Sequence, residues 1–294
     1  MKQRIFFIIN PISGVGRKKS LPRIIENKLD HTQYEYEIAY TEYKKHAGIL
    51  AKQASEQGFD IVCAVGGDGS VHEVGTALIG TATKLAIIPT GSGNGLARHL
   101  GIPKRKSKAI QFINKQESVQ MDTVLVNDES FLGVAGWGFD AHIAKRFEEH
   151  RKRGLITYAR LVVREFFKYN PLNITIDMNG EVKQMPLMLC TIANSSQFGN
   201  GFCVSPKSSI TDGILEMVLM KPFKIWNAPR VVMRSFRKKS DRLKNAEIIQ
   251  FQSATIEIPG HLGHFDGESV CVSSFLKIEV NPHSLNILVG KNKL

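Results

Sequence analysis

Three glycine-rich turns within the first 95 residues constrain the fold more than any other feature of the chain. Each turn closes a short apolar run of the kind that forms a β-strand, and the turns lie at 10–16, 66–70 and 89–95. The apolar runs alternate with helix-type patterns, which predicts a parallel sheet with right-handed crossovers. Ligands of such sheets bind at the carboxyl ends of the strands, so the three turns are expected to converge on one polyanion. This pattern favours a nucleotide phosphate chain.

The pattern of predicted secondary structure changes after about Asn127 and divides the chain into two parts. The second part carries closely spaced β-type runs with turn signals, among them Asn179-Gly180, which predicts an antiparallel, sandwich-like domain. We therefore predict a two-domain α/β protein, with a nucleotide-binding α/β domain at 1–127 and a β-rich domain at 128–294. About the last 10 residues are candidates to belong to the first domain instead of the second. The active site is expected in the cleft between the two domains.

The net charge of +12 limits the possible partners. Lys and Arg cluster at 104–108, 145–153 and 230–244, which suits an anionic membrane surface, nucleic acid or a phosphorylated ligand, or else solvated helix faces. No nucleic-acid recognition motif or aromatic stacking signature is found, so nucleic acid is not expected. No run of about 18 uncharged apolar residues occurs, and the N-terminal apolar stretch is too short for a signal peptide. Four scattered cysteines fit a reducing compartment, and a cytoplasmic protein is expected.

The middle turn, Gly66-Gly67-Asp68-Gly69-Ser70, is the most specific of the three. Its glycines allow a ligand to approach the backbone, Ser70 can donate its hydroxyl at a helix N-terminus, and Glu73 lies one turn further on. A carboxylate beside phosphates makes sense where a divalent cation lies between them. We favour this interpretation of Asp68 over helix capping.

The two flanking turns are also rich in glycine and polar residues, but they indicate phosphate binding less specifically. The segment from Asn10 to Arg17 is neither a Walker A loop nor a dinucleotide fingerprint, and alone it is a weak indicator of phosphate binding. In the third turn, Ser92 and Asn94 can satisfy phosphate oxygens, and the helix beginning near Gly95 adds its positive dipole end.

Taken in order, these motifs resemble the diacylglycerol kinase catalytic-domain family, which includes bacterial lipid kinases, sphingosine kinases and ceramide kinases and is related to NAD kinases. The similarity rests first on Asn-Pro-x-Ser-Gly, Gly-Gly-Asp-Gly-Ser/Thr and Pro-x-Gly-Ser/Thr-x-Asn. It continues through 137–141, 211–213 and 265–268, which are similar to the family's Gly-Phe-Asp-Ala, Asp-Gly and Asp-Gly-Glu segments.

The resemblance implies an ATP site in the first domain. Its glycine loops would hold the ATP phosphates, and Thr41, ahead of His46-Ala47, would contact the nucleotide. The residues expected to bind nucleotide are Asn10, Pro11, Ser13, Gly14, Thr41, Gly66, Gly67, Asp68, Gly69, Ser70, Glu73, Gly91, Ser92, Gly93 and Asn94.

The resemblance also assigns catalytic and metal-binding roles. The late Asp-Gly-Glu motif supplies the family's catalytic base, which falls on Asp266 or Glu268, and Asp68 is expected to join them as a catalytic residue. Without the resemblance, the late motif fits a plain hairpin turn, and the nearby His261 and His264 are expected to be surface or turn residues. The structural magnesium of bacterial members would be bound here by the residues Asp212, Ser209 and Ile214.

The activity implied is that of an ATP-dependent lipid kinase, which transfers the γ-phosphoryl group of Mg-ATP to the hydroxyl of diacylglycerol or a related long-chain lipid. Such an enzyme would be cytoplasmic and peripheral to the inner face of the membrane, and a homodimer is compatible with the sequence. A sphingoid-base kinase, an NAD kinase and a catalytically silent nucleotide-binding regulator remain alternatives. Many bacterial relatives have Asp at the position of Gly95, whereas sphingosine kinases have a small residue there, as this chain does. Sphingosine kinases also carry an acidic residue for the amino group of their substrate, but the corresponding position here is about His142. The acceptor lipid is therefore open.

Overall fold

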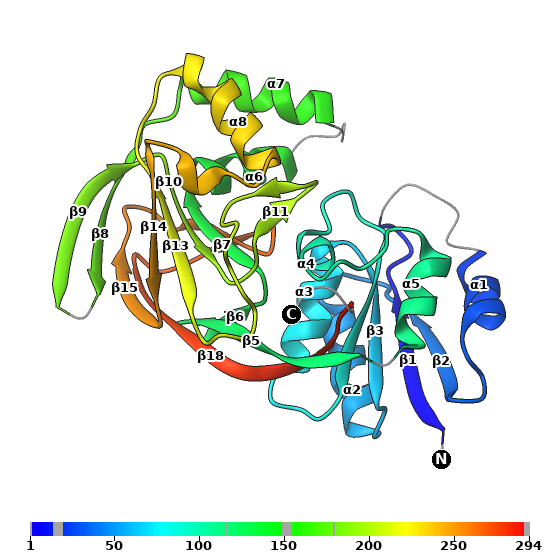
Figure 1. Cartoon of the computed structure of the whole chain (residues 1–294). Coiled ribbons are helices and arrows are strands. Elements are labelled where there is room, and N and C mark those ends of the chain that lie inside the picture. Colours follow the sequence, from blue (N-terminus) through cyan, green and yellow to red (C-terminus); the bar gives the residue numbers. More distant parts are fainter. Residues whose placement is uncertain (1, 14–19, 116, 149–154, 179, 291–294) are drawn as a thin grey trace. The chain divides into compact units, whose positions relative to one another are not determined.

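The computed structural model describes residues 2–13, 20–115, 117–148, 155–178 and 180–290. Contacts within the chain divide it into two units (Figure 1). The first unit comprises Met1–Thr123, Ile210–Asp212 and Asn281–Leu294, and the second comprises Val124–Ser209 and Gly213–Val280. The chain therefore passes between the units more than once, and the assignment of 1–127 and 128–294 to two domains stays a prediction.

The first unit is built on a parallel sheet. Its strands are β1 (Gln3–Ile9), β2 (Tyr34–Tyr40), β3 (Ile61–Gly66) and β4 (Lys84–Pro89), in the order β2-β1-β3-β4. Its helices are α1 (Leu21–Lys28), α2 (His46–Glu56), α3 (Asp68–Ala77), α4 (Gly95–His99) and α5 (Lys106–Ile113). Every residue of β3 is buried, as expected for a central strand of a parallel sheet that is covered on both faces.

The second unit contains two antiparallel sheets. One sheet has the order β14-β13-β10-β7-β16-β17, and in the other β15 lies between β8 and the first part of β18. The strands of the first sheet are β7 (Val134–Gly138), β10 (Leu189–Ala193), β13 (Leu215–Met220), β14 (Ala246–Phe251), β16 (Leu262–Phe265) and β17 (Glu268–Cys271). The remaining strands are β5 (Ser118–Val126), β6 (Glu129–Phe131), β8 (Leu172–Met178), β9 (Glu181–Leu187), β11 (Gln197–Gly199), β12 (Phe202–Cys203), β15 (Ser253–Glu257) and β18 (Phe275–Leu288).

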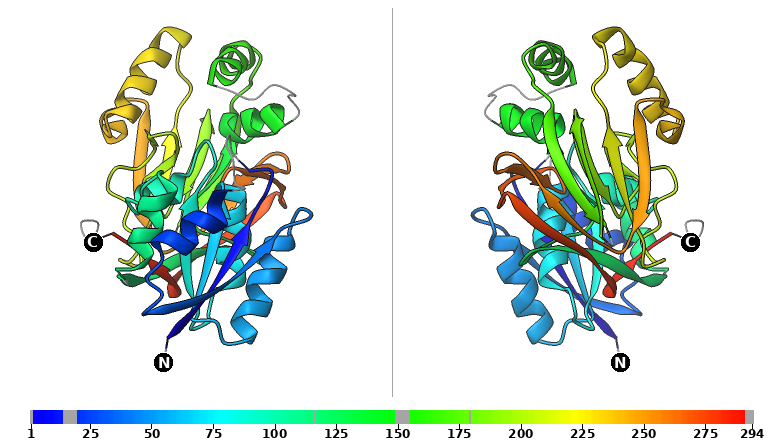
Figure 2. Two further views of the ribbon diagram at one scale, coloured as in Figure 1. Left: turned by 90° about the vertical axis from the view of Figure 1, so that its right-hand side faces the viewer. Right: turned by 90° about the vertical axis from the view of Figure 1, so that its left-hand side faces the viewer.

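Helices accompany these sheets at one end of the second unit (Figure 2). They are α6 (Phe139–Glu148), α7 (Leu155–Phe166) and α8 (Ala228–Phe236), with the short 3₁₀ helices η2 (Ile225–Asn227) and η3 (Ser240–Arg242). Within the part of the chain that the structure describes, no helix has the length and apolar character needed to cross a membrane.

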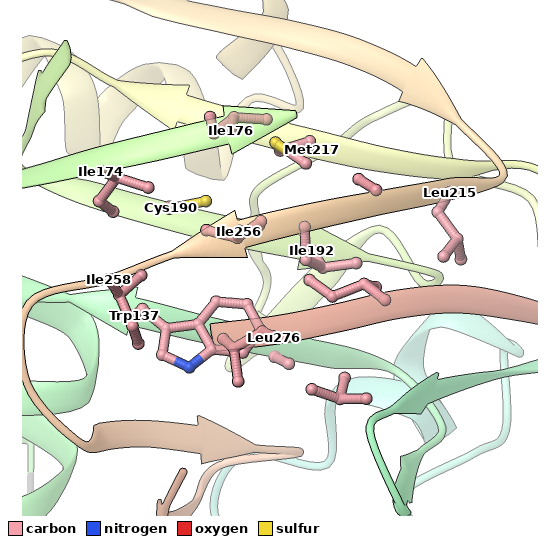
Figure 3. Close-up of a cluster of buried hydrophobic side chains, with 14 of the residues drawn as sticks. Trp137, Ile174, Ile176, Cys190, Ile192, Leu215, Met217, Ile256, Ile258 and Leu276 are labelled. Atoms are coloured by element: carbon pink, nitrogen blue, oxygen red, sulfur yellow. The ribbon is translucent and has the colours of Figure 1, made fainter. Parts of the chain in front are cut away.

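The core of the second unit lies between its two sheets (Figure 3). Trp137 of β7, Ile192 of β10 and Met217 of β13 pack with Ile176 of β8 and Ile256 of β15 in one buried cluster. These strands alternate inward apolar residues in both layers, which is the arrangement of a β-sandwich. The predicted fold class, a parallel-sheet α/β domain with an antiparallel sandwich, is confirmed.

Two local features compare the sequence expectation with the structure. Met178 pairs with Glu181, which confirms the predicted hairpin, although Asn179 itself lies outside the described residues. By contrast, two separate strands are expected at 275–280 and 285–289, where the structure has the single strand β18. The strand continues through Pro282 and His283, although His283 has a left-handed backbone (φ 51°) and donates its backbone N–H to Asp122 Oδ1.

Candidate functional site

The carboxyl ends of four adjacent parallel strands carry the expected nucleotide-binding residues of the first unit. Asn10 follows β1, Thr41 follows β2, Gly67 follows β3 and Thr90 follows β4. Backbone hydrogen bonds join these ends, from Asn10 N–H to Val65, from Thr41 N–H to Ile9 and from Thr90 N–H to Gly66, with N···O distances of 3.1, 3.0 and 2.8 Å. The three glycine-rich turns therefore meet at one edge of the sheet, as the sequence predicts.

The second and third turns touch through their glycines. A Cβ atom added to Gly91 would lie 2.6 Å from the Cα atom of Gly67, and one added to Gly66 would lie 2.2 Å from Ser70 Oγ. No side chain fits at such separations without moving backbone, so these glycines are required by loop packing whether or not a phosphate is bound.

Asp68 links the second turn to the third. Its Oδ2 atom accepts a hydrogen bond from the backbone N–H of Asn94 (2.8 Å), and its Oδ1 atom accepts one from Gly95 (2.7 Å). These amides begin α4, so the structure places Asp68 in the capping role that the sequence analysis ranks second. A helix N-terminus stabilises a carboxylate, because the first N–H groups of the helix have no hydrogen-bond partner within the helix. A catalytic role for Asp68 stays a prediction.

The first turn joins the same assembly through side chains. Asn10 donates from Nδ2 to Ser70 Oγ at 3.1 Å, and Ser13 Oγ lies 3.0 Å from Thr90 Oγ1. Pro11 is exposed, whereas Gly14 lies outside the described residues. The hydroxyl of Ser70 thus supports the first turn as well as standing at the start of α3.

The third turn is closed by its own asparagine. Asn94 has a left-handed backbone (φ 53°), and its side chain accepts from Gly91 N–H and donates to the Gly91 carbonyl. Asn94 is buried, whereas Ser92 is exposed and Gly69 and Gly93 are half-buried. Ser92 and the two half-buried glycines are therefore open to a ligand, whereas Asn94 shapes the turn.

Glu73 contacts a helix rather than a glycine turn. Its carboxylate oxygens accept from the backbone N–H groups of Lys45 (2.9 Å) and Ala47 (3.1 Å), at the beginning of α2. Glu73 therefore holds the segment that follows Thr41, and its effect on a nucleotide would pass through that segment. Thr41 itself is buried at the end of β2.

The late acidic turn lies between β16 and β17 of the second unit. Asp266 has a left-handed backbone (φ 50°), and its carboxylate accepts from the N–H groups of Leu132 (2.9 Å), Gly133 (2.7 Å) and Val134 (3.2 Å). Glu268 begins β17, pairs with Phe265 and is half-buried. Three backbone amides hold the Asp266 carboxylate and so fix the turn, whereas the catalytic roles of Asp266 and Glu268 stay predictions.

A buried histidine beside this turn differs from expectation. His264 is 3% exposed on β16, not a surface or turn residue, because it lies in the interior of a paired strand and its ring packs against Phe198, with the ring centroids 5.6 Å apart. Its Nε2 atom lies 3.1 Å from Asp140 Oδ2, and Thr191 Oγ1 donates to the same oxygen at 3.3 Å. A Cβ on Gly136 would stand 2.1 Å from that oxygen, so this glycine makes room for the pair.

Neither Asp140 nor Thr191 is predicted as a site residue from the sequence. The available signal is the position of Asp140 in the Gly-Phe-Asp-Ala segment, and nothing local to β10 indicates Thr191. The cluster joins the buried His264 and Thr191 to the half-buried Asp140, and His264 lies two residues before Asp266 in the sequence.

The Asp140 carboxylate also affects a nearby phenol. The pKa of Tyr169 is raised, mainly by burial and in second place by the negative charge of Asp140, which keeps this phenol protonated.

The expected magnesium ligands fall in a loop that crosses between the units. Asp212 belongs to the first unit and is exposed, whereas Ser209 and Ile214 belong to the second. Among the residues that the structure describes, no three His, Cys, Asp or Glu side chains gather as a metal site. One carboxylate with two other oxygen donors is a different set, and it stays a prediction, as does the expected cleft.

The first unit is of a recognisable class: a parallel α/β sheet with amide-rich turns and helix N-termini at the carboxyl ends of its strands, as in phosphate-binding domains. The family model "Diacylglycerol kinase catalytic domain" matches residues 4–126, and "YegS C-terminal NAD kinase beta sandwich-like domain" matches residues 133–289, more than half of the chain. The chain belongs to the family defined by these two domains, the diacylglycerol kinase-like lipid kinases. It is therefore a phosphotransferase.

Individual relatives agree with this assignment. The chain is 26% identical to "Diacylglycerol kinase" of Bacillus subtilis, over 87% of this chain and 86% of that protein. It is 29% identical to "Probable lipid kinase YegS-like" of Chromohalobacter salexigens, over 67% of this chain and 63% of that protein. A crystal structure of a diacylglycerol kinase from Bacillus anthracis superposes with a TM-score of 0.75 at 19% identity, over 99% of this chain and 98% of that one. At this identity the superposition supports the fold alone.

Proposed function

We propose that the protein is an ATP-dependent lipid kinase, which transfers the γ-phosphoryl group of Mg-ATP to the hydroxyl of diacylglycerol or a related long-chain lipid. The observation that carries the proposal is the meeting of three glycine turns at one sheet edge, where Asp68 links the second turn to the third and Asn10 links the first to the second. Phosphoryl transfer depends mainly on positioning and on charge stabilisation, and such turns supply fixed backbone N–H groups for both.

In this proposal the first unit binds the nucleotide. Backbone N–H groups of the turn at 66–70 and of Ser92 and Gly93 hold phosphate oxygens, Ser92 adds a hydroxyl, and Thr41 contacts the nucleotide. Asn10, Ser13 and Glu73 act by fixing these segments, since each is bonded to a neighbouring turn or helix. Asp68 keeps the two glycine turns in one arrangement.

Glu268 is proposed as the general base. A carboxylate within hydrogen-bond reach of the acceptor hydroxyl takes its proton as the oxygen attacks the γ-phosphorus. Asp266 positions Glu268 by holding the turn to the amides of 132–134.

Magnesium would be held by Asp212 with the backbone carbonyls of Ser209 and Ile214, and such oxygen donors are the ligands that this ion takes in proteins. When bound near a nucleotide, a magnesium ion neutralises phosphate charge.

One ion pair disfavours the alternative of a sphingoid-base kinase. An amino group on the acceptor would need an acidic partner near His142, and the acid closest to hand is Glu165. That carboxylate is already bonded to His142 (2.9 Å) and to Arg164 (2.9 Å). Both bonds, with that to His142 the stronger, hold the pKa of Glu165 below its usual range. A neutral acceptor such as diacylglycerol fits this arrangement better.

The proposed place of action is the inner face of the cell membrane, with the protein cytoplasmic and associated peripherally. The +12 net charge supports such association, because anionic lipid surfaces attract clustered Lys and Arg by on the order of 1 kcal/mol for each nearby cation. A homodimer remains compatible with the sequence.

The test is a lipid-panel kinase assay with ATP labelled on its γ-phosphate and a total cellular lipid extract as acceptor. We expect label in the chloroform phase, with mass spectrometry identifying a phosphorylated diacylglycerol or a related lipid. Label that stays in water and requires NAD would assign an NAD kinase. ATP binding without transfer to any acceptor would assign a silent regulator.

A further inference from the structure

Half of the exposed large hydrophobic side chains in the described residues come from two neighbouring helices. Twelve such side chains are exposed in all, and six belong to α7, α8 and the turns beside them. These six are Val163, Phe167, Trp226, Val232, Met233 and Phe236, and we call them the α7/α8 patch. Trp226 is 77% exposed and Phe167 is 70% exposed, values far above those of residues that belong to a core. Apolar groups gathered in this way mark an interaction surface.

One aromatic contact joins α7 to the loop that leads into η2 and α8. The ring of Phe166 in α7 lies 5.3 Å from that of Phe223, and Phe223 precedes Trp226 by three residues. Figure 2 shows α7 and α8 at the same end of the second unit. The exposed Phe167 and Trp226 each follow closely on one of the two contacting rings.

The exposed residues of α8 lie on one face of the helix. Val232, Met233 and Phe236 stand at i, i+1 and i+4, which places them side by side along the helix. The opposite face is turned inward, where Val231 and Ser235 are buried. This helix therefore presents large apolar side chains on its exposed face.

Basic residues surround the apolar face. The segment 221–244 holds nine Lys and Arg and one acid, a net charge of +8 out of +12 for the whole chain. Arg230 and Arg237 are exposed and lie one turn before and one turn after Met233, so they border the apolar face. Arg164 is likewise exposed beside Val163 on α7. An apolar strip that carries Trp and Phe and is flanked by Arg and Lys is typical of helices that lie in a membrane interface.

We propose that the α7/α8 patch is the surface by which this protein docks onto an anionic lipid bilayer. The six apolar side chains enter the boundary between headgroups and acyl chains, and the flanking Arg and Lys side chains contact lipid phosphates. The inference rests on the proposed lipid kinase function for its biological sense, and it goes further because it names the surface and the residues. The choice of an anionic bilayer follows from charge complementarity, since the segment 221–244, which holds four of the six apolar side chains, has a formal charge of +8.

Vesicle sedimentation of the full chain tests the apolar part of the surface. The vesicles contain phosphatidylcholine and phosphatidylglycerol in equal parts, and pure phosphatidylcholine vesicles serve for comparison. We expect Trp226→Ser and Phe236→Ser each to weaken partitioning by roughly tenfold, the effect of losing partial burial of one large apolar side chain. The matched control is Phe275→Ser, because Phe275 is a 60% exposed phenylalanine of the same unit that lies outside the patch. It should bind as the unsubstituted protein does.

Charge reversal tests the basic border. Arg230→Glu combined with Arg237→Glu should abolish the preference for phosphatidylglycerol vesicles, whereas Lys183→Glu on β9 should leave the preference in place. Thermal melts by circular dichroism verify that each variant is folded.

Two results would overturn the proposal. One is equal vesicle binding by Phe236→Ser, Phe275→Ser and the unsubstituted protein. The other is a dimer in light scattering that Phe236→Ser dissociates, which would assign the patch to a second copy of the chain. A second assay, phosphorylation of diacylglycerol dispersed in detergent, measures kinase activity without a bilayer and so distinguishes failure of the docking surface from failure of the proposed kinase function. Patch-dependent vesicle binding without any lipid phosphorylation refutes the kinase alone, and phosphorylation with patch-independent binding refutes the surface alone.

Discussion

The two units each contain an aspartate beside a glycine at the end of a strand, and the comparison separates scaffold from chemistry. Asp68 of the first unit accepts two amides at the beginning of α4, whereas Asp266 of the second accepts three amides of the segment 132–134. Both carboxylates fasten a distant loop, one at a helix N-terminus and the other between two strands. In the proposed function the chemistry is assigned to neighbouring groups: backbone N–H groups in the first unit and Glu268 in the second.

Glu268→Gln gives the largest expected effect. The substitution keeps the shape of the side chain and removes the proton acceptor, so turnover should fall by about 10²–10⁴-fold while ATP affinity is unchanged. Single-turnover phosphorylation and nucleotide titration measure the two quantities. The control is Glu257→Gln on β15, an exposed glutamate of the same unit. Full activity of Glu268→Gln would remove Glu268 as the base and leave Asp266 or Asp68 in that role.

Asp68→Ala should lower turnover by up to ~10²-fold, because the two glycine turns lose their link and a displacement on the order of 1 Å is enough for such a loss. It should also lower the free energy of unfolding by about 2–4 kcal/mol, the cost of two charge-assisted hydrogen bonds. Urea unfolding and the kinase assay measure both effects. Asp60→Ala removes a carboxylate that accepts from Arg4 N–H at the start of β3, the end of this strand opposite to the glycine turn. That control should lose stability and keep activity, so an equal loss of activity in both variants would contradict the linking role.

Gly91→Ala should act on the same pair of turns with a smaller effect. The added Cβ would lie 2.6 Å from Gly67 Cα, which forces the turns apart and should weaken ATP binding by roughly tenfold. Isothermal titration with ATP measures the change. Gly58→Ala is the control, since its left-handed backbone (φ 75°) is strained by any side chain but has no atom within 4 Å of the new Cβ. Gly58→Ala should cost about 1 kcal/mol of stability and no ATP affinity.

The fold of the first unit could be predicted from sequence because strand, turn and helix repeat at short range there. Each glycine turn directly follows its apolar run, so the meeting of Asn10, Gly67 and Gly91 at one sheet edge follows from parallel topology alone. The second unit was harder to predict because its important contacts join distant segments. The Asp140–His264 pair spans 124 residues, and no local pattern indicates it.

Charge and apolar patterning explain two further differences. Helix α8 lies inside a segment that reads from sequence as a basic cluster, because Arg and Lys interrupt its apolar residues. The capping role of Asp68 could not be separated from a metal-binding role in sequence, since both place a carboxylate at a helix N-terminus. In each case the side chain's partner lies on another element, and only the structure supplies it.

The smallest expected effects are responses of the two units to opposite ends of the pH scale. In the first unit, the hydrogen bond to Glu26 raises the pKa of Tyr36 from 10.0 to about 12. Stability from this bond is therefore present at neutral pH and is lost as the pH rises from about 10 to 12. In the second unit, the bond from His142 holds the pKa of Glu165 below its usual 4.5, so that contribution is present above pH 4.5 and is lost as the pH falls below it.

Urea unfolding across the pH range, followed by circular dichroism, measures both contributions. Tyr36→Phe should flatten the alkaline side of the stability profile and leave the acid side unchanged, whereas Glu165→Gln should do the reverse. Tyr40→Phe, which alters a 47% exposed tyrosine of the same strand, serves as the control on the alkaline side. If Tyr36→Phe altered the acid side, or if Tyr40→Phe flattened the alkaline side equally, the contributions could not belong to these single pairs. The two units would then lose stability through shared charge repulsion, since a net charge of +12 grows further as carboxylates are protonated.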